Sequence, residues 1–308
     1  MVRVRKRVIG GQEYYYLEHS VRVGGRVEKR ERYLGRTMPR DLRSVRERFL
    51  ADLRRERWHP ALEAIRRAYS RDFRRSPPSA RERNLEAFAV QFTYNTQRIE
   101  GSTLTLRETA DLLVRRVTPA ERPVGDVKEA EAHRAVFLSL LHERKDLALG
   151  MVLRWHHELF RATHPDIAGR IRRHQVAISG SRFVPPSPVE VDPLLREFFR
   201  WYDRAKDSMH PVELAGLAHL KFVTVHPFSD GNGRVARLLM NFVLHRRGLP
   251  MLDIPYSGRN RYHGALEQSQ IRGEESIFLE WFLRRYVREN RRFLTEGGAV
   301  SGTRKRRS

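Results

Sequence analysis

The 308-residue sequence contains no cysteine. Disulfide bonds, zinc sites with thiolate ligands and cysteine nucleophiles are therefore excluded. No apolar run approaches the roughly 18 residues that a membrane-spanning helix needs. The first residues, Met-Val-Arg-Val-Arg-Lys-Arg, are not followed by the apolar segment of a secretory signal. We therefore expect a cytoplasmic protein with no membrane partner.

Lysine is scarce as well, and arginine carries most of the positive charge. Only 7 of the 60 basic residues are lysines. The formal net charge is +23, of which residues 1–40 contribute +7 and residues 288–308 contribute +5. Basic ends of this kind suit a polyanionic partner, although a charge run is most often a solvated surface. Apolar residues make up 40% of the chain, which is enough to build a sizeable core.

Residues 1–37 have the pattern of a small β-module. Three runs rich in β-forming residues are separated by two pairs of glycines: 2–9, 14–23 and 26–34, with Gly10-Gly11 and Gly24-Gly25 between them. Glycine pairs between such runs are typical of tight hairpin turns, so the pattern predicts a three-stranded meander.

A sheet of this size is marginal alone, so we expect it to pack on the helical part of the chain. The residues expected to make that contact are Tyr14, Tyr16, Tyr33 and Leu34. A basic sheet with aromatic residues also suits nucleic acid. A solvated basic face is the commoner meaning of the pattern, so nucleic acid is an open but not a favoured partner.

The rest of the chain is predicted to be mainly α-helical. Residues 38–145 form a helical segment that is interrupted at Ser76-Pro77-Pro78-Ser79. Residues 146–288 form the main helical core. The last residues, 289–308, are predicted to be a basic, disordered tail.

The most informative segment is 226–237, which reads His-Pro-Phe-Ser-Asp-Gly-Asn-Gly-Arg-Val-Ala-Arg. Apolar residues recur at helical spacing before it, over 211–225, and within and after it, over 234–245. Gly248 is a suitable stop for the second helix. The segment is therefore predicted to be a tight loop between two buried helices that runs into the start of the second.

Such a loop suits an anion. A Gly-Asn-Gly turn over 231–233 can adopt positive φ and aim backbone N–H groups at one point, and the start of the following helix adds its positive dipole end. Arg234 and Arg237 are three residues apart and can share a helix face. Arginine forks match phosphate oxygens. The pattern favours a phosphate-binding site.

Two further side chains in the loop can do chemistry on a bound phosphate. Asp230 offers a hard oxygen for Mg²⁺, which usually binds through one or two carboxylates and substrate phosphates. His226 titrates near neutral pH and can take a proton from an attacking hydroxyl. Each residue type is commonplace by itself. Their joint occurrence in one loop is what indicates a site.

The segment resembles the signature of the Fic (fido) family, His-x-Phe-x-Asp/Glu-Gly-Asn-Gly-Arg-x-x-Arg, and matches it at every specified position. Most members with this signature transfer AMP from ATP to a protein hydroxyl. The resemblance implies that His226 is the base, that Asp230 binds Mg²⁺ and that the glycine–asparagine–glycine turn binds the anion. The two arginines would hold the β- and γ-phosphates. A kinase-like branch has Lys in place of Gly233, so Gly233 favours nucleotidyl transfer.

Two other segments extend the resemblance. Residues 170–188 are predicted to form a β-hairpin around a Ser-Gly-Ser turn and resemble the family's flap, which registers the target backbone by strand addition. The flap residues singled out are Ser181, Arg182, Phe183 and Val184. Tyr262 lies in a stretch that resembles the family's adenosine contact, although a tyrosine on a helix is often core packing.

An inhibitory motif is indicated upstream. Residues 96–101 read Thr-Gln-Arg-Ile-Glu-Gly and resemble the family motif Ser/Thr-x-x-x-Glu-Gly/Asn. They end a predicted helix over 84–99, and Thr96 and Glu100 share one face because they are four residues apart. The resemblance implies inhibition by Glu100 from a helix before the core, as in the subgroup to which the endoplasmic-reticulum enzyme of animals belongs. The alternative is an ordinary helix end.

The sequence thus predicts a mainly α-helical Fic-type core with a β-hairpin flap and a small N-terminal β-meander. The predicted function is protein adenylyltransfer to a Ser, Thr or Tyr hydroxyl, with ATP and Mg²⁺, restrained by Glu100. Two alternatives stay open: removal of AMP from a modified protein at the same site, and a nucleic-acid-binding regulator whose core only senses nucleotide. Relatives of this class often dimerise, so a homodimer also stays open.

Overall fold

The computed structural model of the chain describes residues 2–23 and 26–295. It contains two compact units, residues 1–60 and the residues from 61 onward, and the division falls at Pro60 inside a helix. This division is not one of the boundaries predicted from the sequence, which fall after residues 37 and 145. The first part of the helix that follows the sheet packs on the sheet, and helices on both sides of residue 145 pack together in one core.

The first unit contains the predicted three-stranded antiparallel sheet, in the order β1-β2-β3. Its strands are β1 (Arg3–Ile9), β2 (Gln12–Val23) and β3 (Arg26–Gly35). The β1–β2 turn is made by Gly10 and Gly11, whose φ angles of 58° and 77° suit a type I′ turn that only glycine-like residues adopt readily. The second predicted glycine break, at 24–25, lies outside the described residues.

One face of this sheet is covered by the start of α1 (Leu42–Arg75). Leu17 is 1% exposed and forms a cluster with Val2 and Phe49, against which Leu34 and several residues of α1 pack. The expectation that Tyr14, Tyr16 and Tyr33 pack on the helix is wrong within this unit. Alternation along the strands places these tyrosines on the face opposite Leu17, where their rings contact one another.

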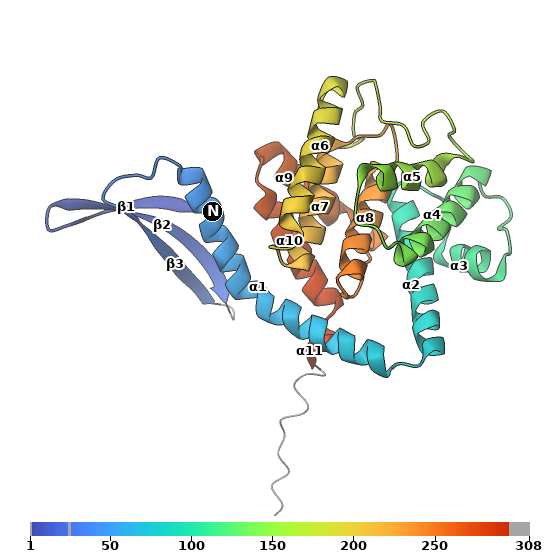
Figure 1. The fold of residues 1–308 in the computed structure, drawn as a ribbon, viewed down its shortest axis with the longest axis horizontal. Coiled ribbons are helices and arrows are strands. Elements are labelled where there is room, and N and C mark those ends of the chain that lie inside the picture. Colours follow the sequence, from blue (N-terminus) through green and yellow to red (C-terminus); the bar gives the residue numbers. More distant parts are fainter. Residues whose placement is uncertain (1, 24–25, 296–308) are drawn as a thin grey trace, which may run out of the picture. The chain divides into compact units, whose positions relative to one another are not determined.

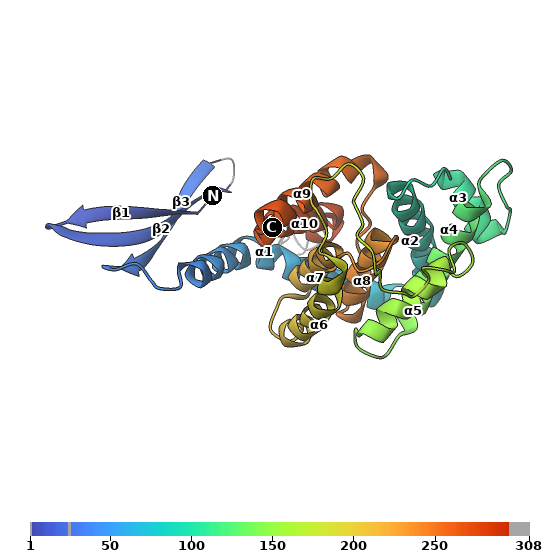
Figure 2. The same ribbon diagram turned by 90° about the horizontal axis from the view of Figure 1, so that it is seen from above.

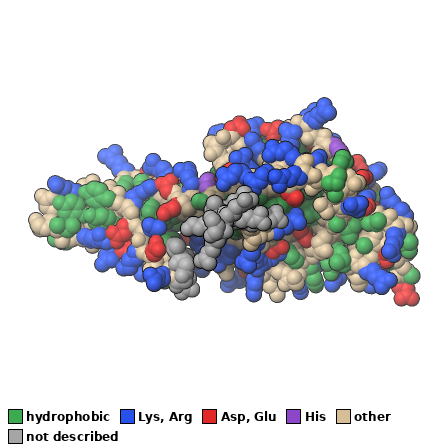
Figure 3. Space-filling model, turned by 90° about the horizontal axis from the view of Figure 1, so that it is seen from below, with side chains coloured by type: hydrophobic (Ala, Val, Ile, Leu, Met, Phe, Trp, Pro, Cys, Tyr) green, Lys and Arg blue, Asp and Glu red, His purple; other side chains and the backbone are tan. Residues whose placement is uncertain are grey.

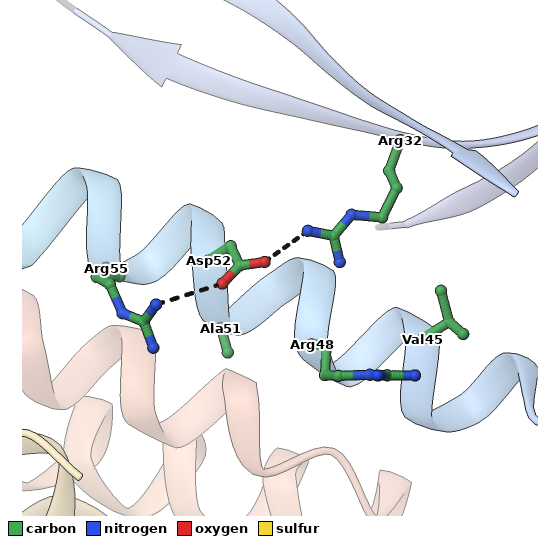
Figure 4. Close-up of a pocket in the computed structure, with 6 residues that line it drawn as sticks. All are labelled: Arg32, Val45, Arg48, Ala51, Asp52 and Arg55. Atoms are coloured by element: carbon green, nitrogen blue, oxygen red, sulfur yellow. Dashed lines mark hydrogen bonds and ion pairs between the residues drawn. The ribbon is translucent and has the colours of Figure 1, made fainter. Parts of the chain in front are cut away.

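A hollow of the first unit lies between β3 and α1 and is lined mainly by charged side chains (Figure 4). Asp52 lies between two arginines there, 2.5 Å from Arg32 and 3.6 Å from Arg55. Arg48 also lines the hollow. Three arginines and one carboxylate line this hollow, which leaves the region with an excess of positive charge.

All regular secondary structure among the described residues of the second unit is helical. After the second half of α1, its elements are α2 (Pro78–Ile99), α3 (Leu106–Arg115), α4 (Val124–His142), α5 (Leu149–Phe160), α6 (Pro188–Ala205), α7 (Pro211–Val225), α8 (Asn232–Arg246), the 3₁₀ helix η1 (Tyr256–Gly258), α9 (Arg259–Arg272), α10 (Glu275–Glu289) and α11 (Arg292–Thr295). None of the described helices is long and apolar enough to cross a membrane.

The pair α7 and α8 forms the centre of this unit (Figures 1 and 2). Both helices are buried along most of their length. Apolar residues occupy most positions of α7, whereas α8 also buries four polar residues, Asn232, Arg234, Arg237 and Asn241. Helices α6 and α10 pack on α7, whereas α2, α4 and α5 pack on α8. The predicted helices over 211–225 and 234–245 are confirmed, and Gly248, with φ 65°, follows the second as predicted.

The predicted β-hairpin over 170–188 is wrong in one respect. No strand is present among these residues. A turn does form at Gly180, where the Ser181 N–H donates to the Ile178 carbonyl over 3.1 Å. The two arms are joined by a side chain instead of a ladder, since Gln175 Nε2 donates to the Pro185 carbonyl over 3.0 Å. Two prolines after Val184 remove the N–H groups that a second strand would donate.

The expected tail begins later than residue 289. Helix α11 follows α10 after a short break, and Phe293 is only 2% exposed. The Phe293 ring packs edge-on against Tyr69 of α1, with centroids 5.6 Å apart. Residues 296–308, the rest of the predicted tail, lie outside the described residues.

Candidate active site

The loop between α7 and α8 turns sharply at both ends. Helix α7 is followed directly by His226, which has φ 51° and ψ 58°, in the left-handed region that residues other than glycine seldom adopt. Helix α8 is preceded by Gly231, with φ 78°. A Cβ on Gly231 would lie 2.3 Å from the Phe160 ring. Glycine is therefore required here both for its φ and for the close approach of Phe160.

The His226 ring is held in one tautomer. Its Nδ1 lies 3.2 Å from the Val223 carbonyl, and a carbonyl oxygen only accepts, so Nδ1 carries the proton. The lone pair is then on Nε2. Burial lowers the pKa of His226, and the charge of Arg172 adds to this, while the Val223 carbonyl opposes it. The ring is neutral at pH 7, the form that can act as a base.

Three buried side chains hold the carbonyl groups of this loop. Arg172 donates through Nε to the His226 carbonyl over 2.8 Å. Asn232 donates to the Phe228 carbonyl over 2.8 Å and accepts from the Phe228 N–H over 2.9 Å. His156 Nε2 lies 3.0 Å from the Asp230 carbonyl.

The N–H groups at the start of α8 have no such partners within the helix. The first bond of α8 runs from the Val235 N–H to the Gly231 carbonyl, so the N–H groups of residues 232–234 precede it. With the carbonyls bound elsewhere, these donors and the positive end of the helix dipole make this turn suitable for an anion. The Asn232 side chain supports the turn and does not itself reach outward, since it is 2% exposed.

His156 is the residue that sequence reasoning missed most clearly. Its Nδ1 accepts from the Gly169 N–H over 2.9 Å, so its Nε2 carries the proton donated to the Asp230 carbonyl. Its ring stacks on Phe228 with centroids 3.8 Å apart. Burial lowers the pKa of His156 to about 4, so it is neutral and structural. The available signal was a histidine on the apolar face of a predicted helix.

Arg234 lies between two carboxylates and an aromatic ring. It is 4% exposed, pairs with Asp230 over 2.7 Å and with Glu129 of α4, and lies 4.5 Å from the centroid of the Phe160 ring. Burial disfavours the charged guanidinium, but the carboxylates of Asp230, Glu100 and Glu129 outweigh it and raise the pKa of Arg234. Glu129, which no motif marked, fixes the direction of this guanidinium.

Arg237 of α8 forms an ion pair with Glu100, the glutamate of the predicted inhibitory motif. Arg237 Nη2 lies 2.5 Å from Glu100 Oε1, and its Nε donates to the Thr96 hydroxyl over 3.3 Å. The Arg237 side chain is 1% exposed and that of Glu100 is 24% exposed. Burial opposes ionisation of Glu100, but the charges of Arg237 and Arg234 outweigh it and lower the pKa of this carboxyl.

The same carboxylate lies over the turn that is suited to an anion. A Cβ built on Gly233 would lie 2.5 Å from Glu100 Oε1 and 3.0 Å from Arg237 Nη1. No larger residue fits between them without displacing one. Glu100 therefore occupies, with its own negative charge, the region next to the free N–H groups where an anion would bind.

Asp230 is suited to be the protein ligand of a metal ion whose other ligands are mainly phosphate oxygens of a bound substrate. Its carboxylate is 52% exposed and lies next to the anion-binding turn. Burial raises the pKa of Asp230, but the charge and hydrogen bond of Arg234 together with the bond from the Gly231 N–H outweigh burial and lower this pKa, so the carboxylate is ionised. The described residues contain no group of three or more His, Asp or Glu that could hold a metal by themselves. One exposed carboxylate beside a phosphate site matches the usual protein share of a Mg²⁺ site.

The flap tip contacts α9. Glu267 accepts from the Arg182 N–H over 2.6 Å and from the Ser181 hydroxyl over 3.2 Å. The Phe183 N–H bonds to the Ser181 hydroxyl over 3.2 Å. Val184 is 73% exposed, which leaves it open to a partner.

Tyr262 is part of the core. It is 1% exposed, its hydroxyl lies 2.8 Å from His219 Nε2, and its ring packs near Trp281 with centroids 5.6 Å apart. The ring has no open face for an adenine in this arrangement. The structure gives no support to the predicted adenosine contact of Tyr262.

Comparison with known families gives one match. Residues 146–244 match the model of the Fic/DOC family. The matched region runs from just before α5 to near the end of α8, and so includes the loop and His156.

Curated relatives in animals are similar over a larger region. The chain is 36% identical over 197 residues to "Protein adenylyltransferase Fic" of Drosophila ananassae, which covers 62% of this chain and 39% of that one. It is 32% identical over 193 residues to the protein of the same name in Nematostella vectensis, covering 61% of this chain and 45% of that one. The chain thus matches less than half the length of these relatives.

Solved structures are similar in fold. One is a Fic domain containing signaling protein from Bacteroides thetaiotaomicron, with a TM-score of 0.68 and 26% identity, covering 75% of this chain and 96% of that one. Another is Fic-1 (aa134 - 508) from C. elegans, with a TM-score of 0.68 and 25% identity, covering 83% of this chain and 76% of that one.

Proposed function

Because the chain belongs to the Fic family, we propose that it transfers AMP from ATP to a hydroxyl side chain of a target protein. The name that curated relatives carry, protein adenylyltransferase, supports this class of reaction. The observation that carries the proposal is the position of a neutral histidine, His226, directly before a turn of free N–H groups and the two buried arginines of α8.

The proposed step is a displacement at the α-phosphorus of ATP. His226 Nε2 takes the proton of the target hydroxyl, and the hydroxyl oxygen forms a bond to the α-phosphorus. The bond from that phosphorus to the oxygen that bridges to the β-phosphate breaks, and pyrophosphate leaves. Protonated His226 then returns its proton to solvent.

The residues of α8 provide the electrostatic part of this step. The N–H groups of residues 232–234 and the guanidinium of Arg234 would face phosphate oxygens and stabilise the charge that develops on them. Donors of this kind are effective because they are already oriented: the loop carbonyls are held by His156, Arg172 and Asn232. When bound between Asp230 and the phosphates, Mg²⁺ would neutralise further phosphate charge.

Glu100 is proposed to restrain this activity. Its carboxylate pairs with Arg237 and lies beside Gly233. A phosphate that approached Arg237 would meet a like charge, so productive ATP binding requires that Glu100 move away. Arg237 would then be free to hold a terminal phosphate.

The position of Glu100 also favours the reverse reaction as a second candidate. Its carboxylate is partly exposed and close to the anion-binding turn. It can accept a hydrogen bond from a water molecule and orient it toward the α-phosphorus of a modified side chain. Hydrolysis would then release AMP and restore the hydroxyl.

The position of the transferred label tests the main proposal. The protein is incubated with a cell lysate and either α-³²P-ATP or γ-³²P-ATP, and labelled proteins are separated and analysed by mass spectrometry. We expect label and an added AMP mass only with α-³²P-ATP. Transfer of the γ-phosphate would show a kinase-like reaction and overturn the proposal. Release of AMP from pre-labelled protein measures the reverse reaction.

A further inference from the structure

The sheet of the first unit has one face that the helix does not cover. Cross-strand pairing aligns Arg5 with Tyr16 and Arg7 with Tyr14 on β1 and β2, and Tyr16 with Tyr33 on β3. Together with Arg3, these six residues lie on the face opposite Leu17, because side chains alternate along a strand. We call this surface the open face. Its counterpart is the face against which α1 packs.

The open face carries both charge and flat aromatic surface. Arg3 and Arg5 are exposed, and Tyr33 is 53% exposed. The Tyr33 ring contacts Tyr16, with centroids 5.3 Å apart, and the Arg7 guanidinium lies 4.6 Å from the centroid of the Tyr16 ring. A solvated face has no need of packed tyrosines. The Tyr16 ring restricts the position of the Arg7 guanidinium above the sheet.

The first unit, which contains the open face, carries a net positive charge that would attract a polyanion. Residues 1–60 contain 17 Lys and Arg against 8 Asp and Glu, a formal net charge of +9. Figure 3 shows basic side chains over much of one side of the molecule, with acidic ones fewer between them. A concentration of positive charge on a small unit attracts nucleic acid at a distance and holds its phosphates on contact.

The dimensions of the sheet select the form of nucleic acid. The axes of three strands spaced about 4.8 Å apart span roughly 10 Å, which is comparable with the roughly 12 Å width of the B-form major groove. Arg3, Arg5 and Arg7 recur roughly every 7 Å along β1, so they form a row of positive charge along one edge of the sheet. The major groove of A-form RNA is too deep and narrow to admit a sheet.

Two glutamates on the open face do not prevent this contact. Glu18 pairs with Arg5 over 2.9 Å and with Lys29 over 3.5 Å, and Glu31 pairs with Arg7. Ion pairs near the surface contribute little to stability, because water and salt screen them. Phosphate groups can replace them, since each phosphate adds a charge-assisted bond and releases a counterion from the DNA.

We propose that the open face of the N-terminal sheet binds double-stranded DNA in its major groove. The arginines of β1 contact phosphates, and the tyrosines of β2 and β3 contact the groove floor or the sugars. This binding site belongs to the first unit alone. It is independent of the nucleotide chemistry of the helical unit.

The test uses the full-length protein and a fluorescent 20-base-pair DNA duplex, with binding followed by anisotropy over a series of KCl concentrations. The matched variants are Arg5→Ala/Arg7→Ala on the open face and Arg43→Ala/Arg115→Ala elsewhere. The control arginines have side chains that are 85% and 72% exposed, and both doubles remove the same charge. Far-UV circular dichroism and thermal melting check that each variant is folded.

We expect the dissociation constant of the open-face double to rise at least about tenfold and its salt slope to fall by about 2. The dissociation constant and the salt slope of the control double variant should change much less. A Glu18→Gln/Glu31→Gln variant should bind DNA more tightly than wild type, because its arginines are unpaired and its repulsion of phosphate is gone.

Three results would overturn the proposal. The first is no binding of the duplex by the wild-type protein in about 100 mM KCl. The second is an equal loss in the two arginine doubles, which would show attraction by net charge only. The third is tighter binding of single-stranded DNA or of an RNA duplex of the same sequence.

Discussion

The Glu100 carboxylate and the Arg237 guanidinium meet 2.5 Å apart, although 137 residues separate them in the chain. Glu100 ends helix α2, and Arg237 lies in the second turn of α8. The Arg237 side chain is almost completely buried, and the Thr96 hydroxyl is its second partner. The segment with the predicted inhibitory motif is thus joined to α8 by an ion pair and by hydrogen bonds from Arg237 to Thr96.

Substitution Glu100→Gly should release the activity. Without the carboxylate, Arg237 is free for a phosphate, so auto-labelling from α-³²P-ATP should rise strongly over wild type. Breaking one side of a buried pair costs about 3–5 kcal/mol, so the variant should also melt at a lower temperature without ligand and gain more from ATP than wild type does. Equal labelling of both proteins would show that residues 96–101 are an ordinary helix end.

Substitution His226→Ala should stop transfer but leave ATP binding largely intact. The base acts on the attacking hydroxyl and not on the phosphates, and loss of a general base lowers rates by about 10²- to 10⁴-fold. The double variant Glu100→Gly/His226→Ala should show no labelling above that of a blank sample. Calorimetry should give it an ATP affinity similar to that of the Glu100→Gly single variant. Labelling that persists in the double variant would remove His226 from the mechanism.

Removal of the metal should stop transfer as well. EDTA should abolish labelling by Glu100→Gly, and added Mg²⁺ should restore it. Asp230→Asn should raise the Mg²⁺ concentration needed for half-maximal labelling, because a neutral amide is a weaker ligand than a carboxylate. Full activity of Asp230→Asn in EDTA would contradict the predicted metal site.

Substitution His156→Phe tests the support of the loop carbonyls. Phenylalanine keeps the stacking on Phe228 but loses the bonds to Asp230 and Gly169, and leaving such buried groups unpaired costs about 1–3 kcal/mol each. ATP affinity and labelling in the Glu100→Gly background should both fall. The matched control is His133→Phe, which removes an equally buried histidine that bonds only to Thr93.

His133→Phe should lose stability but keep its labelling per folded molecule. An equal loss of labelling in the two variants would mean that His156 acts through general stability. In that case the carbonyl of Asp230 would need no specific donor.

Stability should fall with acid between pH 6.5 and about 4.5. Burial lowers the pKa of His156 to about 4 and those of His133 and His219 to about 3, so in this window the unfolded chain binds protons that the folded chain does not. Each such histidine removes about 1.4 kcal/mol of unfolding free energy per pH unit below 6.5.

The carboxyl group of Asp253 has the opposite effect on stability as the pH falls. Burial raises the pKa of Asp253 to about 7, so its folded form holds an extra proton as pH falls below 7 and gains stability there. The histidines outnumber it, so the net slope should still be a loss of stability with acid. Urea unfolding at several pH values measures this slope. It should be shallower in His156→Phe, and an unchanged slope would contradict a low pKa for His156.

The sequence by itself determined the local elements and the chemistry of the loop. Helical spacing predicts α7 and α8, a glycine pair predicts the β1–β2 turn, and the segment 226–237 predicts a base, a carboxylate and an anion-binding turn in one place. These features depend on neighbours a few residues apart. Backbone preferences and periodicity are therefore enough to predict them.

Only the tertiary structure decided which distant groups meet. His156, Arg172 and Glu129 carry no motif of their own, and their bonds to the loop and to Arg234 exist because α4, α5 and the 170–188 segment pack around α8. Packing also buried Tyr262, which the sequence alone allowed to face a ligand. Long-range contacts depend on how helix faces fit together, and a one-dimensional pattern does not contain that information.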